Sequence, residues 1–86
     1  MYLHLGKSTV IRHDEIVGIF DIENTTVMRS TRDFLSRAQR DGRVVNVSYE
    51  LPGSFVVCDA GDRETVYISQ ISPATLKKRA TGNKIV

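Results

Sequence analysis

Arginine is the residue type whose spacing most suggests chemistry in this sequence. Five arginines fall between positions 29 and 43 of an 86-residue chain, and guanidinium groups bind phosphate oxygens well. At about 100° per residue, the apolar residues of this stretch share one side of a helix. The opposite side carries Arg29, Arg32, Arg37 and Arg40. Two interpretations stay open: a solvated helix face partly neutralised by Asp33 at i,i+4 spacing, or contact with an anion such as nucleic acid.

A second group of cations lies near the end of the chain. Residues 73–86 contain Lys77, Lys78, Arg79 and Lys84 and no acid, although the whole chain has a net charge of only +2. Such a segment could release counterions from nucleic acid. Equally, the first three could stabilise the C-terminal end of a short helix through its dipole.

Other chemistries have weaker support. "GKST" at positions 6–9 matches the end of a phosphate-binding loop, but Met1 stands where the first glycine should be, and a short β-branched stretch follows instead of a helix. We therefore expect a hairpin turn there. His4 and His13 are far apart in sequence and no pattern pairs either of them with a nucleophile, and Cys58 has no metal-ligand spacing around it. No catalytic residue, cofactor, metal or small-molecule ligand is predicted.

The elements that position these residues can be located by hydrophobic period. Strands are predicted over 1–6, 9–12 and 15–22, the last apolar on both faces and therefore buried, with a bulge or close approach at Gly18. A helix follows over 26–41, capped by Asn24, Thr25 or Thr26 and ended by Gly42 in a left-handed conformation. A three-stranded antiparallel meander over 45–50, 54–60 and 64–71 comes next, and then a short helix over 73–80 capped by Ser72. The predicted fold class is α+β, a single small antiparallel sheet with one packed amphipathic helix and a short C-terminal helix.

The tyrosines and the strand edges carry further expectations. Tyr49 and Tyr67 could be stacking platforms for bases, although packing against the helix or a neighbouring strand is the favoured interpretation. The segments "YLHL" and "ETVYISQI" have few charges, and we expect them to be sheet edges available for assembly.

Length predicts one domain over 1–86, and we expect a frayed basic tail from about residue 81. A single cysteine favours a reducing compartment, and no apolar run is long enough to span a membrane. We therefore expect a cytoplasmic protein, and a core this small makes help from partner subunits unsurprising.

The sequence resembles the extracellular matrix regulatory proteins, a family of small bacterial regulators. The resemblance rests on "MYLHLG" at the start, "IVGIFD" at 16–21, "AQRDGRVVNVSY" at 38–49 and "LKKRA" at 76–80. It implies a non-enzymatic bacterial cytoplasmic protein that controls biofilm matrix genes. It also implies assembly into rings and DNA binding by basic residues.

The resemblance also implies two basic positions that this chain lacks. One is an arginine pair after the strand ending in tyrosine, where this chain has Glu50, Leu51 and Pro52 after Tyr49; the other appears here as Glu15. DNA contact would therefore need other cations, and the candidates are Arg29, Arg32, Arg37, Arg40, Lys77, Lys78 and Arg79. The leading hypothesis is a homo-oligomeric regulator that binds duplex DNA through multivalent backbone contacts. The alternative is an oligomeric scaffold or protein-interaction module that does not bind DNA.

Overall fold

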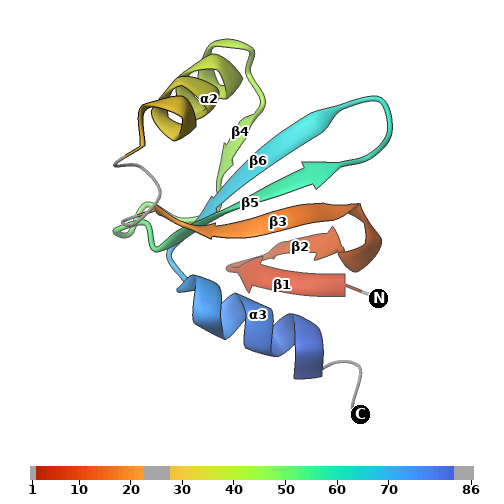
Figure 1. The fold of residues 1–86 in the computed structure, drawn as a ribbon. Coiled ribbons are helices and arrows are strands. Elements are labelled where there is room, and N and C mark those ends of the chain that lie inside the picture. The colour runs from red at the N-terminus through yellow and green to blue at the C-terminus, as the bar shows by residue number, and fades with distance from the viewer. Residues whose placement is uncertain (1, 23–27, 83–86) are drawn as a thin grey trace.

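The computed structural model describes residues 2–22 and 28–82, except for the side chain of residue 81 (Figure 1). Its elements follow the predicted order of strands, helix, strands and helix. They are β1 (Tyr2–Gly6), β2 (Thr9–Arg12), the 3₁₀ turn η1 (His13–Glu15), β3 (Ile16–Asp21), α2 (Arg29–Arg40), β4 (Val44–Asn46), β5 (Ser54–Asp59), β6 (Glu64–Ser69) and α3 (Pro73–Gly82).

The α+β class is confirmed, but the prediction of a single antiparallel sheet is wrong. β1 and β2 form a two-stranded sheet, and the other strands form a four-stranded mixed sheet in the order β3-β5-β6-β4. β5 and β6 are an antiparallel hairpin, closed where Ala60 N donates to Arg63 O at 3.1 Å. Because β3 occupies the free edge of β5, β4 pairs with β6 instead, in parallel. β6 is therefore a central strand and not the predicted edge.

The four-stranded sheet has a layer on each face. Alternate residues of a strand point to opposite faces. Val56 and Cys58 of β5 pack in a cluster with Leu3, Leu5 and Leu76, which come from the β1–β2 hairpin and α3. Phe55 and Val57 pack on the other face with Ala38 of α2. Helices α2 and α3 therefore lie on opposite sides of the sheet (Figure 1).

β3 departs from its prediction as a buried strand. It is an edge strand of the larger sheet, and Val17 keeps 65% of its surface exposed. The register with β5 shifts between Ile16 and Gly18, so Val17 is the extra residue of a β-bulge, in agreement with the prediction for Gly18. β3 is apolar on both faces, but it lies at the edge of the sheet and α2 covers only part of the face above it. Its apolar side chains on that face are therefore not all buried.

The ends of α2 are set by local backbone chemistry. Gly42 has φ +70°, which confirms its predicted left-handed conformation, and Arg43 N donates to Ala38 O at 2.9 Å. The N-cap is Met28, in extended conformation, so Met28 lies outside the helix predicted to contain it. The predicted caps at Asn24, Thr25 and Thr26, together with the apolar position at Val27, fall outside the described residues.

The two remaining local predictions concern turns. Thr75 N donates to Ser72 Oγ at 3.3 Å, which confirms the Ser72 cap; α3 continues to Gly82, two residues beyond its predicted end. The rest of the predicted tail, residues 83–86, lies outside the described part of the chain. Gly6 and Lys7 both have positive φ between β1 and β2, so the "GKST" segment is a hairpin turn as predicted.

Candidate nucleic-acid interface

Helix α2 presents a face of four exposed arginines, here called the α2 arginine face: Arg29, Arg32, Arg37 and Arg40. The opposite side of the helix packs on the sheet through Phe34, Leu35 and Ala38, as the apolar spacing predicts. Eleven residues separate the outer arginines, or about 16 Å along the axis. Duplex DNA carries roughly nine phosphate charges over that length. The cations are therefore spaced for contact with several phosphates.

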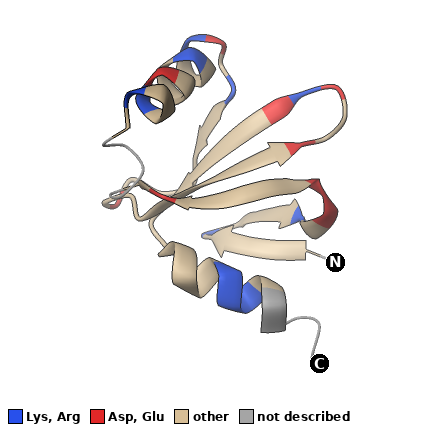
Figure 2. Cartoon of the chain, viewed as in Figure 1, with Lys and Arg blue, Asp and Glu red and all other residues tan. Residues whose placement is uncertain are grey.

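The α2 arginines are electrostatically available. Among the described residues, the ion pairs involve only Arg12 and Arg43. The predicted pairing of Asp33 with Arg29 or Arg37 is therefore not made, although its carboxylate still lowers the net charge of this face. Figure 2 marks the basic residues along α2, and all four arginines of the face are exposed.

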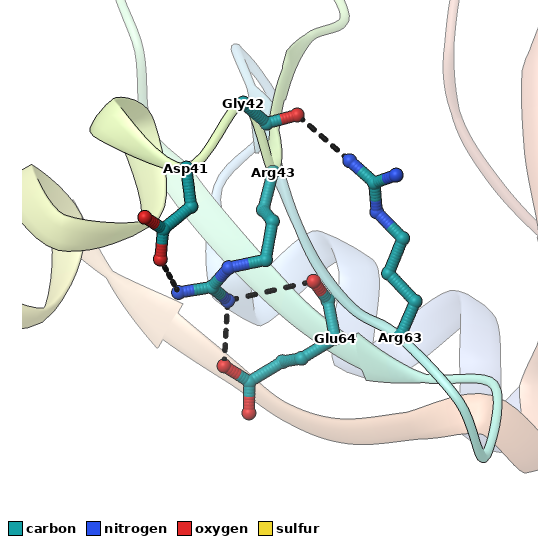
Figure 3. A network of polar contacts seen from close by, with 5 residues as sticks. All are labelled: Asp41, Gly42, Arg43, Arg63 and Glu64. Carbon is teal, nitrogen blue, oxygen red and sulfur yellow. Dashed lines mark hydrogen bonds and ion pairs between the residues drawn. The ribbon is translucent and has the colours of Figure 1, made fainter.

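Arg43, the fifth arginine of the segment, is held inside the fold (Figure 3). Its Nη1 donates to Glu64 Oε1 at 2.9 Å and to Glu64 O at 3.4 Å, and its Nη2 donates to Asp41 Oδ2 at 3.4 Å. Only 18% of its side chain is exposed. Beside it, Arg63 donates to Gly42 O at 2.9 Å. These contacts tie the end of α2 to the start of β6, so Arg43 is part of the scaffold and not of the exposed face.

The cations of α3 are not brought together with those of α2. Lys77, Lys78 and Arg79 are exposed, but Leu76 packs against the opposite sheet face, and the two basic regions are separated by the sheet (Figure 2). Arg79 Nη1 also donates to His4 O at 3.3 Å. The structure therefore places the two groups of candidate cations on opposite sides of the sheet.

The segment between β4 and β5 differs from its prediction. Tyr49 is expected in a strand with its ring packed, yet β4 ends at Asn46, and Tyr49 is 104% exposed in a loop. Leu51 is 88% exposed. Glu50 N donates to Ser48 Oγ at 3.1 Å, and the hydroxyl donates back to Glu50 Oε2 at 3.4 Å. We call residues 48–52 the Tyr49 loop. A turn held by the Ser48 hydroxyl takes the place of the predicted strand. The sequence does not reveal this turn, because its residues continue the alternating pattern of a strand.

An apolar groove of about 470 Å³ lies between α2 and the β3–β5 side of the sheet. Its apolar lining consists of Val17, Phe20, Met28, Phe34, Phe55 and Val57. The rings of Phe20 and Phe55 stack with their centroids 5.1 Å apart. A Cβ on Gly18 would lie 2.6 Å from Phe20 Cζ, so the glycine leaves room for that ring. The sequence does not predict this groove. The one related prediction is the bulge or close approach at Gly18, the residue that leaves room for the Phe20 ring of the groove.

The described residues offer little for catalysis. They include no group of three or more His, Cys, Asp or Glu residues arranged to hold a metal ion. The Cys58 side chain is buried. Burial and, to a lesser degree, the charge of Glu15 raise the pKa of the Cys58 thiol to about 11, so it is not a nucleophile at neutral pH. No helix in the described ranges is long and apolar enough to cross a membrane.

Two comparisons with known proteins place the chain. The RemA-like family description, "Extracellular matrix regulatory protein A-like", matches residues 2–80. Extracellular matrix regulatory protein B of Bacillus subtilis (strain 168) is 36% identical over 80 residues, which cover 93% of this chain and 90% of that protein. The family match extends across the two sheets, α2 and nearly all of α3.

Proposed function

The chain belongs to the RemA-like family of extracellular matrix regulatory proteins, and from this membership we propose that it is a non-enzymatic bacterial regulator of extracellular matrix gene expression. We expect it to act in the cytoplasm, as a homo-oligomer that contacts duplex DNA. The contact surface is the α2 arginine face. It holds the DNA backbone and reads no base, and the α3 cations take no part in the same contact.

The availability of the α2 arginines carries this proposal. All four are exposed, and none forms an ion pair with a described residue. A guanidinium that already has a carboxylate partner must lose it before it binds phosphate, whereas these four need only shed water. Their number is small for one chain, so binding by a monomer should be weak. Several copies on one duplex raise the affinity through effective concentration.

Binding to duplex DNA across a salt series tests the proposal. Each phosphate contact releases counterions and contributes about −0.9 to the slope of log K against log salt. We expect Arg29→Ala and Arg40→Ala each to weaken binding and make the slope shallower. Arg12→Ala is the matched control, because Arg12 is an exposed arginine on β2 that pairs with Asp14 at 2.9 Å. No binding at low salt, or affinity that does not change with salt, would contradict DNA contact.

The alternative function is an oligomeric scaffold without DNA contact. The apolar groove and the Tyr49 loop favour it, because exposed apolar surface is typical of protein-interaction sites. Glu50 adds a negative charge in that loop, which would repel phosphate. If Arg29→Ala and Arg40→Ala leave assembly and regulation intact and the wild type does not retain DNA, this alternative replaces the proposed function.

A further inference from the structure

The fold leaves two unmatched apolar features at one end of the molecule, the Tyr49 loop and the apolar groove. We infer that the Tyr49 loop of each copy inserts into the apolar groove of a second copy, with Tyr49 and Leu51 as the apolar contacts and Glu50 between them. This inference rests on the self-association in the proposed function and names the surfaces that make it.

The groove is open because α2 covers only part of its sheet face. Val17 projects from the bulge of β3 with 65% of its surface exposed, and Phe20 is also exposed. A bulge of this kind redirects a side chain, and here it adds Val17 to the same groove as Phe20. Large apolar side chains left in water at one place favour an occupant that removes them from water.

The loop is apolar at its tip and is held by hydrogen bonds at both ends. Tyr49 and Leu51 project fully into solvent, so the loop does not fill the groove of its own chain. The Ser48–Glu50 hydrogen bonds hold its start, and Gly53 N donates to Ser69 O at 2.9 Å at its end. A pre-formed loop loses less conformational entropy on binding than a flexible one does.

Charge favours a second copy as the occupant. Glu50 is the acid of the loop. The N-terminal end of α2 forms the polar rim of the groove, through Ser30 and Thr31 beside Met28. The first turn of α2 contains no acid, and Met28 provides no side-chain cap. The positive end of the helix dipole and exposed Arg29 therefore attract a carboxylate. Glu64, the acid of the groove lining, is already held by Arg43 at 2.9 Å.

The loop and the groove lie at the same end of the larger sheet. The loop leads into β5 at Ser54, which pairs with Asp21, and the next pair inward is Phe55 with Phe20. The loop therefore lies at the sheet end where the phenylalanines of the groove begin. The loop of one copy and the groove of the next are different surfaces, so the contact is heterologous, repeats from copy to copy and closes into a ring if the rotation between copies allows it.

Complementation between two variants tests the inference by solution mass. The loop variant Tyr49→Ser/Leu51→Ser keeps an intact groove, and the groove variant Val17→Glu keeps an intact loop and adds a carboxylate that repels Glu50. Each variant alone should raise the dissociation constant of self-association by at least about tenfold. An equimolar mixture should regain a pair of twice the mass of one chain, because one loop–groove contact is complete. Val10→Glu is the matched control, since Val10 is another exposed strand valine, on β2 outside the groove.

The outcomes separate the two proposals. All substituted side chains are exposed, and circular dichroism with a thermal melt checks that each variant folds. Variants that assemble as strongly as the wild type, or a mixture that stays as weak as either variant alone, overturn the loop–groove contact and leave the proposed function standing. A wild type that is monomeric at all concentrations overturns both.

Discussion

Arg40 and Arg43 lie three positions apart and have opposite surroundings. Arg40 is exposed on the last turn of α2 and has no ion pair with a described residue, whereas Arg43 is enclosed by Glu64 and Asp41. The difference arises at Gly42, whose left-handed conformation turns the chain so that Arg43 faces β6. Arginine count alone therefore overstates the exposed positive charge of this segment by one.

Arg43→Ala should lower the free energy of unfolding by about 1–2 kcal/mol, because it removes a partly buried charge-assisted hydrogen bond and leaves Glu64 without its partner. Arg40→Ala should change it by less than about 0.5 kcal/mol, as expected for an exposed position. Urea unfolding of the two variants and the wild type measures both effects. Equal effects would contradict the assignment of Arg43 to the scaffold.

Cys58 gives the fold a pH dependence above neutrality. Its thiol pKa rises from 9.0 to about 11 on folding, chiefly because of burial, so the unfolded chain loses this proton first as the pH rises. The contribution of the neutral Cys58 thiol to the free energy of unfolding is fully present below about pH 9 and is lost between pH 9 and 11. Burial also raises the pKa of Tyr67, which acts in the same direction.

Unfolding measured from pH 7 to 11 should show the wild type losing on the order of 1–2 kcal/mol more than Cys58→Ala. Tyr67 is present in both proteins, but the charge of Cys58 adds to the rise of the Tyr67 pKa, so the difference measures the thiol together with its effect on Tyr67. Parallel stability curves for the two proteins would show that Cys58 ionises equally well in the folded chain.

At the scale of elements, the sequence predicts what local chemistry determines. The hairpin turn at Lys7, the end of α2 at Gly42 and the Ser72 cap depend on residues within a few positions of each other, and all three are confirmed. Strand pairing depends on distant partners. Nothing near Val44–Asn46 indicates that β4 would pair in parallel with β6, and the apolar pattern of β3 cannot reveal how much of the sheet face α2 covers.

Some features of the candidate nucleic-acid interface also follow from local sequence, and others depend on distant contacts. Helical spacing correctly predicts which side of α2 is apolar and which arginines face outward. It cannot predict that α2 and α3 lie on opposite sides of the sheet, because that depends on which face of β5 each helix packs against. The position of Tyr49 in a loop could not be predicted from the sequence either, because the alternating pattern predicts a strand where the structure has the Ser48–Glu50 turn.

Gly42→Ala should lower the free energy of unfolding by roughly 1 kcal/mol. Nothing lies within 4 Å of a Cβ added there, so the cost comes from a side chain at φ +70° and not from a clash. The exposed variant Ser36→Ala within α2 is a suitable comparison, and thermal unfolding measures the difference. An unchanged melting temperature for Gly42→Ala would show that the helix end tolerates another conformation.

At the scale of the whole molecule, charge and apolar surface are distributed over different regions. α2 presents arginines on one side of the sheet, and α3 presents lysines on the other (Figure 2). The groove and the Tyr49 loop lie together at one end of the larger sheet. Under the two proposals above, one surface would bind DNA while another binds a second copy, and a single chain would bind DNA weakly on its own.

The salt dependence of duplex DNA binding by two charge variants tests the central claim most directly. Arg37→Ala/Arg40→Ala removes two cations from the α2 arginine face, and Lys77→Ala/Lys78→Ala removes two from α3. The account predicts that the α2 variant flattens the slope of log K against log salt by about 1.8 for each bound chain, whereas the α3 variant keeps the wild-type slope. A larger loss of slope in the α3 variant, or equal losses in both, would contradict the assignment of DNA contact to α2.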